Sequence, residues 1–486
     1  MTVVERPLLP LDAGEQYRFA FSMEACVGCH SCEVACAEQN GNPAGVNWRR
    51  VGELEAGSFP DTKRFNLSMA CNHCLDPACL TGCPTNAYIK LDNGIVKHQA
   101  EECIGCQYCI WNCPYEVPAF NPERGIVTKC DMCLPRLEAG RMPACVDACP
   151  TGAITVERVN VAAWRDDHAS ANGPGLPPAD ITLSTTRVIL PATTPAMTLV
   201  ASDQRVRPEH PHWPLIALTL LTQLALGAVA ATVAAELIVG GRRADALTGG
   251  AVAAAVCGAL AMAVSLLHLG RPIQAWRALR NLRSSWLSRE VALFGLFAIG
   301  AISYAAAWFA GLPTLALGVV TVGLGAAGVY ASGRLYLVPA RPVWNSPRTL
   351  VAFFATAMAT GPLVALLAVD RDALGGGAAL LLSVGAGGTI AQLLVYRALI
   401  ERVAGRGERE YRGTARLLFE HFRTLFFVRL ALAASCCGLL AIAAFASTSS
   451  ALLGAALCAA AVGELLGRYL FYVTVTPMST AGTFHR

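Results

Sequence analysis

The sequence predicts an α+β domain followed by an all-α bundle of eight membrane-spanning helices. Two observations predict this fold class. Of the 20 cysteines, 16 lie between residues 26 and 149, in four regularly spaced runs. From residue 213 onward, long apolar stretches follow one another with short polar connections. We therefore expect a cysteine-rich domain at residues 1–160, a linker at 161–212 and a membrane anchor at 213–486.

The four cysteine runs share one pattern, in which three closely spaced thiols precede a fourth. The runs are Cys26, Cys29, Cys32 and Cys36; Cys71, Cys74, Cys79 and Cys83; Cys103, Cys106, Cys109 and Cys113; and Cys130, Cys133, Cys145 and Cys149. Three of them end in Cys-Pro. In bacterial ferredoxins such a loop holds three thiolates on one cluster, while the fourth cysteine reaches the neighbouring cluster. The runs therefore predict a ferredoxin-like domain with four [4Fe–4S] clusters.

Structural zinc and disulfides are the two alternatives for these cysteines. Zinc sites commonly use two paired knuckles, whereas this chain has four runs of four, two with identical spacing. Disulfides are typical of small secreted chains in oxidising compartments. Neither alternative explains the fourfold pattern as directly as iron–sulfur ligation does.

The spacing of the runs also suggests how they pair. Residues 87–91 and 95–96, separated by Asp92-Asn93-Gly94, carry a hairpin signal between the second and third runs. This compact connection predicts that runs two and three form one two-cluster unit and that runs one and four form the other. Residues 161–212 are rich in Pro, Thr, Asp and Ser, which predicts an irregular tail or linker.

Eight apolar stretches follow, each long enough to cross about 30 Å of hydrocarbon. They are residues 213–240, 250–269, 291–311, 315–337, 350–369, 376–399, 424–446 and 451–473. Eight such segments in a row leave no amphipathic layer to cover them, so buried helices of a soluble protein do not explain them.

The arginines predict the sidedness of this bundle. With a cytoplasmic N-terminus, 14 arginines fall in inside loops, and only Arg242, Arg243 and Arg371 fall outside. Because positive residues are enriched on the cytoplasmic side, we expect the cysteine-rich domain to face the cytoplasm of a prokaryotic cell.

Several motifs give the chain a family resemblance. Residues 17–155 resemble the iron–sulfur electron-transfer subunit of dimethyl sulfoxide reductase and its relatives. This resemblance rests on the motifs at 26–33, 71–79, 103–109 and 129–133. Residues 213–473 resemble the eight-helix membrane anchor of the same enzymes, through His268-Leu269-Gly270-Arg271-Pro272 and Leu287-Ser288-Arg289-Glu290. The chain thus resembles a fusion of two subunits that are usually separate.

The resemblance implies a function and a set of cluster ligands. In this family the clusters connect a molybdopterin catalytic subunit to quinone or quinol in the membrane, so the chain itself is expected to carry no substrate-transforming molybdenum site. The implied ligand sets are Cys26, Cys29, Cys32 with Cys149; Cys130, Cys133, Cys145 with Cys36; Cys71, Cys74, Cys79 with Cys113; and Cys103, Cys106, Cys109 with Cys83. The arginine bias makes the chain more similar to the cytoplasm-facing relatives, such as sulfite-oxidising enzymes, than to the exported dimethyl sulfoxide reductases.

A quinone site is expected where the second and third helices meet the cluster domain. His268 and Glu290 match the family's quinone-site histidine and glutamate, and Arg271 is included as a third quinone-binding residue. Such groups supply hydrogen bonds to the quinone carbonyls and a route for protons. The alternative is that His268 and Glu290 cap helices and pair with Arg271 or Arg289.

Three other functions are alternatives to this one. A haem-carrying anchor needs axial histidines within helices, yet after residue 213 the chain has only His268, His421 and His485. A redox-driven ion or proton pump needs a series of ionisable groups through the bundle. Glu464 is the only acidic residue that would fit such a series. For Arg429, Glu464 and Arg468 we expect an ion pair that holds the helices together. A purely structural anchor without quinone chemistry is the third alternative.

Overall fold

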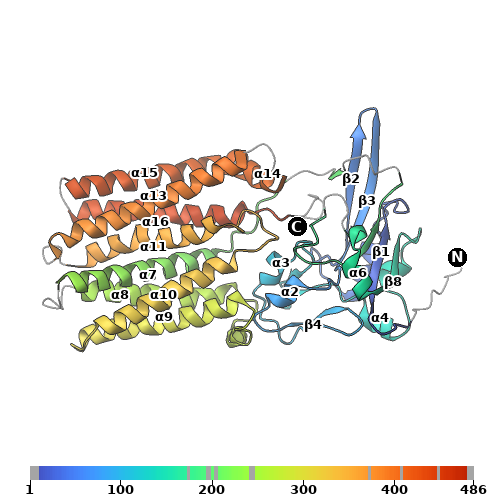
Figure 1. Cartoon of the computed structure of the whole chain (residues 1–486), viewed down its shortest axis with the longest axis horizontal. Coiled ribbons are helices and arrows are strands. Elements are labelled where there is room, and N and C mark those ends of the chain that lie inside the picture. Colours follow the sequence, from blue (N-terminus) through green and yellow to red (C-terminus); the bar gives the residue numbers. More distant parts are fainter. Residues whose placement is uncertain are drawn as a thin grey trace.

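A computed structural model of the chain shows two parts lying end to end, a small domain of strands and short helices and a bundle of long helices (Figure 1). The described residues are 10–171, 176–192, 199–201, 206–239, 247–369, 374–404, 409–445 and 449–478. Both predicted parts of the fold class are therefore confirmed.

The first domain is built from short strands and one-turn to three-turn helices. Its described strands are β1 (Glu15–Ser22), β2 (Arg50–Ser58), β3 (Asp61–Met69), β4 (Tyr88–Lys90), β5 (Val96–His98), β6 (Ala119–Asn121), β7 (Ile126–Thr128), β8 (Ile154–Asn160), β9 (Arg187–Ile189) and β10 (Val200–Ala201). Its described helices are α1 (Ser31–Asn40), α2 (Ala78–Thr81), α3 (Tyr108–Asn112), α4 (Leu134–Glu138), α5 (Ala144–Asp147), α6 (Val161–Asp166) and the 3-10 turn η1 (Ala169–Ala171). The strands form two three-stranded sheets, β8-β1-β9 and β10-β2-β3, and two hairpins, β4-β5 and β6-β7.

The predicted hairpin between the second and third cysteine runs is confirmed. Tyr88 pairs with His98 and Lys90 pairs with Val96 in antiparallel register. Gly94 makes the turn possible, because its φ of 82° lies in the left-handed region that glycine adopts without strain. The hairpin holds runs two and three next to each other, and Cys83, Cys103 and Cys109 share one small core with its residues.

The segment expected as an irregular linker, 161–212, is partly ordered against the first domain. It begins with α6, whose Trp164 is buried and donates its indole N–H to the Ser184 carbonyl at 2.9 Å. Strand β9 then pairs in parallel with β1, and β10 pairs with β2. Composition alone did not reveal this, because three-residue and two-residue strands carry almost no periodic signal.

Among its described residues, the second part contains eight helices long and apolar enough to cross a membrane, as the sequence predicts. They are α7 (Trp213–Val239), α8 (Thr248–Ser265), α9 (Trp286–Phe309), α10 (Leu315–Leu335), α11 (Pro347–Ala368), α13 (Gly377–Ala404), α15 (Arg423–Phe445) and α16 (Ser450–Val473). Short helical segments connect them, namely η3 (Leu266–His268), η4 (Pro272–Leu279), α14 (Arg409–Arg416) and η5 (Leu417–His421). The chain is therefore a multi-pass membrane protein.

Helix α9 starts earlier than the apolar pattern predicts. The expected stretch begins at residue 291, whereas the helix begins at Trp286. Ser285 caps it by accepting a hydrogen bond from the Ser288 N–H, which satisfies one of the free donors at a helix start. Glu290 consequently lies in the second turn of α9 and not at its first residue.

Glycines bring the central helices of the bundle unusually close. A Cβ on Gly227 of α7 would lie 2.1 Å from the Ala357 carbonyl oxygen of α11, and one on Gly361 would lie 2.1 Å from the Gly227 backbone. Small residues at helix crossings allow such backbone contact, which drives helix association in lipid. These crossings fix α7 against α11.

Candidate functional site

All four cysteine runs begin with the same backbone turn. The third residue of each run has a positive φ: Gly28 (67°), His73 (42°), Gly105 (71°) and Met132 (61°). This conformation is strained for residues other than glycine and persists where the surrounding structure demands it. The turn points backbone N–H groups at sulfur, as in the bonds from Gly105 N to Cys103 Sγ (3.4 Å) and from Met132 N to Cys130 Sγ (3.3 Å).

Most electrostatic contacts among the thiols fall within four sets, whereas others join Cys130 to Cys71 and Cys145 to Cys32 across them. The sets are Cys26, Cys29, Cys32 and Cys149; Cys36, Cys130, Cys133 and Cys145; Cys71, Cys74, Cys79 and Cys113; and Cys83, Cys103, Cys106 and Cys109. Each set takes three cysteines from one run and one from another. The structure thus brings together the residues that the resemblance assigns to each cluster, and it groups run one with run four and run two with run three.

The surroundings of the thiols fit a bound metal cluster. All four cysteines of the third set, 71, 74, 79 and 113, line one internal cavity. Lys129, only 3% exposed, donates its ammonium to Cys71 Sγ at 3.5 Å. Burial raises the pKa of the Cys74 thiol to about 12 and that of Cys113 to about 11. Metal-free thiols here would therefore stay protonated at neutral pH, whereas bound iron holds them as thiolates.

A single zinc ion and an iron–sulfur cluster place different demands on their ligands. A zinc ion needs its ligand atoms within about 2.0–2.3 Å, while thiolates on an iron–sulfur cluster bind separate iron atoms. Within the part of the chain that the structure describes, no three His, Cys, Asp or Glu side chains converge on a point that would hold one ion.

Hydrogen bonds from side chains to backbone carbonyls join the two parts of the chain. The Tyr108 hydroxyl of α3 donates to the Leu335 carbonyl at the end of α10 (2.9 Å), and Asn281 Nδ2 donates to the Cys83 carbonyl (2.9 Å). The helices α2 and α3 face the bundle at this junction (Figure 1). Cys83 and Cys106, which belong to the fourth set, therefore lie where the cluster domain meets the membrane helices.

His268 and Glu290 line one largely apolar cavity of about 90 Å³ at this junction. Its wall includes Cys106 from the cluster domain and Tyr336 after α10. Glu290 is 3% exposed, and its Oε1 makes no hydrogen bond of normal geometry with a described residue, although the Ser332 hydroxyl lies near the carboxylate. The structure thus brings the predicted histidine and carboxylate together beside the fourth set of cysteines.

Histidine 268 has a defined tautomer in this arrangement. Its Nδ1 bonds to the Ser265 backbone carbonyl. A carbonyl only accepts, so Nδ1 carries a proton and Nε2 of the neutral ring is an acceptor. His268 also lines a second, wider cavity of about 740 Å³ between the two parts of the chain, together with His210 and His212.

Arg271, the third predicted residue, contacts the cluster domain instead of the cavity. Its Nη1 donates to the Ala100 carbonyl (2.9 Å), and its backbone N–H donates to the Ile104 carbonyl (3.1 Å). Arg289 is also directed elsewhere, because it donates to the Leu282 carbonyl and stacks over Trp286 at 4.4 Å. The two arginines that could have paired with Glu290 thus make other contacts.

Sequence reasoning did not identify several residues of this cavity wall. Tyr108 and Trp111 lie within the third cysteine run, and Tyr336 lies just beyond α10. Trp111 packs edge-on against Trp344, at 5.1 Å between ring centroids, which builds the aromatic side of the junction. No local pattern marks these residues, because they come together only when the cluster domain docks on the bundle.

Comparison with known proteins assigns the two parts separately. Residues 62–159 match the 4Fe-4S dicluster domain family, and residues 208–473 match the DMSO reductase anchor subunit (DmsC) family. One of the chains of the anaerobic dimethyl sulfoxide reductase of Haemophilus influenzae is 39% identical over 177 residues, which cover 35% of this chain and 86% of that relative. The formate dehydrogenase-O iron-sulfur subunit of Escherichia coli is 40% identical over 161 residues, covering 29% of this chain and 53% of that relative. A sulfite dehydrogenase subunit of Allochromatium vinosum is 36% identical over 160 residues, covering 28% of this chain and 67% of that relative.

These matches fall on the two parts that the fold separates. The iron–sulfur relatives correspond to the cysteine-rich domain, and the anchor family covers the eight helices. The chain belongs to the DMSO reductase anchor subunit family and carries, on the same polypeptide, a 4Fe-4S dicluster domain similar to that dimethyl sulfoxide reductase chain, so that it is the iron–sulfur electron-transfer subunit and the membrane anchor of an oxidoreductase complex in one.

Proposed function

We propose that this chain passes electrons between four [4Fe–4S] clusters and a membrane quinone or quinol, which binds in the cavity of His268 and Glu290. The observation that carries the proposal is the unpartnered Oε1 of Glu290, a buried polar atom in a cavity shared with Cys106. Buried polar groups are normally hydrogen-bonded, so a ligand with its own polar atom would complete the site.

The size and lining of the cavity suit a quinone headgroup. At about 10–15 Å³ for each water-sized position, its volume corresponds to roughly six to nine positions, which matches one six-membered ring with its two oxygens. Apolar residues such as Leu218 and Phe294 cover much of the wall. Pockets of this kind bind a mostly apolar ring and orient it with few polar groups.

His268 and Glu290 would handle the protons of the reaction. Neutral His268 offers Nε2 as an acceptor for a quinol hydroxyl, and its protonated form donates to a quinone carbonyl. Glu290 accepts or returns the second proton as a general base or acid. Arg271, which binds the Ala100 carbonyl, would act by holding the cluster domain over the cavity and not by touching the quinone.

The four sets of cysteines would each hold one [4Fe–4S] cluster, which supplies one-electron redox chemistry when bound. The fourth set would exchange electrons with the quinone, because Cys106 lines the cavity. The first set contains Cys29, which is exposed. Two apolar residues close to it in the sequence, Val27 and Val34, are 64% and 67% exposed. Exposed apolar residues beside a redox centre favour docking of a partner protein.

That partner would be a molybdopterin catalytic subunit, which carries the substrate-transforming site that we assign to a separate polypeptide. The relatives named as dimethyl sulfoxide reductase, formate dehydrogenase and sulfite dehydrogenase subunits support this assignment. The arginine bias supports a location in a prokaryotic cytoplasmic membrane with the cluster domain facing the cytoplasm. Arg277 and Arg280 of the corresponding loops lie against Glu102 of the cluster domain.

A titration with a fluorescent quinol analogue tests the quinone site directly. The purified full-length chain should bind the analogue at one site, and His268→Ala should weaken binding roughly tenfold or more, because a buried hydrogen-bond partner is lost. The exposed His421, changed to alanine, serves as the control and should leave binding unchanged. If the wild-type chain bound no analogue, the chain would be a structural anchor only.

A further inference from the structure

A further cavity, separate from those lined by His268, lies at the cluster-domain end of the bundle among α11, α13, α15 and α16. It has a volume of about 70 Å³. Among the described residues it shares no lining residue with the cavity of His268 and Glu290. Its charged and amide-bearing residues are Arg348, Gln392, Arg429, Glu464 and Arg468. Three cations and one acid thus line the same cavity.

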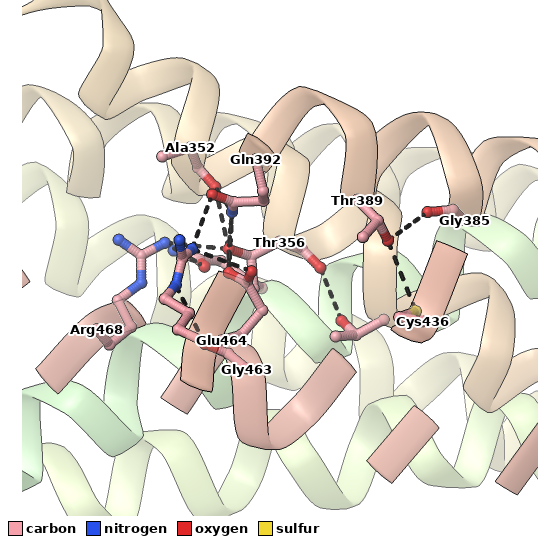
Figure 2. Close-up of polar contacts among 12 residues, drawn as sticks. Ala352, Thr356, Gly385, Thr389, Gln392, Cys436, Gly463, Glu464 and Arg468 are labelled. Carbon is pink, nitrogen blue, oxygen red and sulfur yellow. Dashed lines mark hydrogen bonds and ion pairs between the residues drawn. The ribbon is translucent and has the colours of Figure 1, made fainter. Parts of the chain in front are cut away.

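Glu464 is fully engaged inside this group. Its Oε2 accepts hydrogen bonds from Thr356 Oγ1 (2.6 Å) and Gln392 Nε2 (2.9 Å), and its Oε1 faces Arg429 Nη2 at 3.4 Å. Figure 2 shows Thr356 and Gln392 directed toward Glu464. The predicted ion pair between α15 and α16 is confirmed. Glu464 is the one acidic residue among the lining residues of the cavity and also attracts Arg468, so the three arginines leave positive charge in excess.

Arg468 is a buried cation whose hydrogen-bond partners are neutral. It is 4% exposed, and its Nη2 donates to Gln223 Oε1 (2.7 Å) and Thr356 Oγ1 (3.3 Å). Its guanidinium lies 3.8 Å from the centre of the Phe353 ring. Its Nε has no hydrogen-bond partner among the described residues. In lipid, a buried charge with an unused donor is costly and normally has a counter-charge.

The rim of the cavity adds further positive potential. Arg348 and Thr349 belong to the first turn of α11, where the helix dipole is positive. Val395 and Leu399 are half-buried at the edge of the same cavity, so it reaches the surface of the bundle beside apolar side chains. This combination of an anion-attracting interior and an apolar edge matches a phosphate group attached to acyl chains.

We propose that this cavity binds a phosphate-type oxyanion, namely the headgroup phosphate of an anionic phospholipid. The oxyanion would accept from Arg468 Nε and balance the charge that Glu464 leaves over. At about 10–15 Å³ for each water-sized position, the cavity holds roughly five to seven such positions, enough for one tetrahedral phosphate. The proposal does not depend on the quinone site, with which this cavity shares no wall.

The test measures thermal unfolding of the full-length chain, purified with its clusters, in the presence of added lipid. Short-chain phosphatidylglycerol should raise the unfolding midpoint more than phosphatidylcholine of the same chain length. Arg468→Gln should weaken phosphatidylglycerol binding roughly ten- to hundredfold, because a charge-assisted hydrogen bond is lost. Arg423→Gln removes the same charge from an exposed position at the start of α15 and should leave binding unchanged.

Inorganic phosphate distinguishes the two sources of the oxyanion. Stabilisation by phosphate alone that is lost in Arg468→Gln identifies a free oxyanion at the site, and stabilisation by phosphatidylglycerol alone identifies the lipid. Equal effects of phosphatidylglycerol and phosphatidylcholine on the wild-type chain overturn the proposal, as does undiminished binding by Arg468→Gln. If Arg468→Gln does not assemble, Arg468→Lys replaces it in the test, since it keeps the charge but loses Nε. Weaker phosphatidylglycerol binding by Arg468→Lys supports the proposal, and binding at the wild-type strength overturns it.

Discussion

Arg341 donates to the Glu116 carboxylate at 2.8 Å, although 225 residues separate the two in the chain. The Arg341 side chain is fully buried and that of Glu116 is 10% exposed. Arg341 follows α10 in the bundle, and Glu116 follows the third cysteine run. This ion pair therefore joins the cluster domain to the membrane helices at the level of the fourth set of cysteines.

Arg341→Met should destabilise the docked arrangement. The change removes a buried cation from the Glu116 carboxylate, and breaking a buried ion pair typically costs about 3–5 kcal/mol. Limited proteolysis of the purified chain should show faster cleavage between the two parts. Arg397→Met provides the control, since Arg397 pairs with Glu401 at the exposed surface of α13, where ion pairs contribute little. Equal proteolysis of both variants would show that the Glu116 contact does not hold the parts together.

Gly270→Ala should also disturb the junction, through backbone contact. A Cβ at Gly270 would lie 2.1 Å from the Gly125 carbonyl oxygen, which is closer than any real Cβ approaches. The cluster domain would have to shift away from the cavity, so electron exchange with quinone should slow while the iron content is retained. Gly295→Ala in α9 has open space around it and should have no such effect. Normal quinone-linked rates in Gly270→Ala would contradict close docking.

How much of this site the sequence predicts can be seen from particular residues. His268 and Glu290 were predicted because ionisable groups at membrane depth are rare and were matched by a family motif. The four cysteine runs were predicted because ligand spacing is a local property of the chain, whereas the fourth cysteine of each set came from the family resemblance. Tyr108 and Tyr336 were not predicted, because their role arises only from the docking of two distant segments. The placement of Arg271 against Ala100 follows from the same docking and not from its sequence neighbours.

Iron analysis tests the proposed cluster content. Purified without oxygen, the chain should hold about sixteen iron atoms, from four cubanes with four cysteine ligands each. Cys106→Ser should lose about four of them and should abolish exchange with quinone, because Cys106 lines the quinone cavity. Cys458→Ser, which alters an exposed cysteine in α16, should keep all of the iron. Stoichiometric zinc with little iron would contradict the account.

Reporter fusions test the proposed sidedness. A cytoplasmic reporter fused after residue 486 should be active, because eight spans return the chain to the side of the cluster domain. The same cytoplasmic reporter fused in the loop at Asp370–Asp372 should be inactive, and a reporter that works only outside the cytoplasm should be active there. That loop, like Arg242, Arg243 and Arg371, lies outside the described residues. A residue-486 fusion active only outside would contradict a cytoplasmic cluster domain.

Glu290→Gln separates proton transfer from assembly. The amide keeps the size of the carboxyl group but removes its ionisable proton, so iron content and membrane insertion should be unchanged. Quinone-linked turnover should fall by about 10²-fold, while turnover with a dye that reacts at the catalytic subunit should stay normal. If His268 and Glu290 serve one pocket, adding His268→Ala to Glu290→Gln should cost little more than either change alone.

The central claim is that the clusters exchange electrons with quinone in the cavity of His268 and Glu290. It is tested most directly by reducing the clusters of the purified chain anaerobically, adding a water-soluble quinone and following their reoxidation by stopped-flow absorbance. Wild type and a Glu420→Gln control, which alters an exposed carboxylate, should reoxidise at the same rate, and Glu290→Gln should be slower by about 10²-fold. Reoxidation of Glu290→Gln at the wild-type rate, with its full iron content, would contradict the claim.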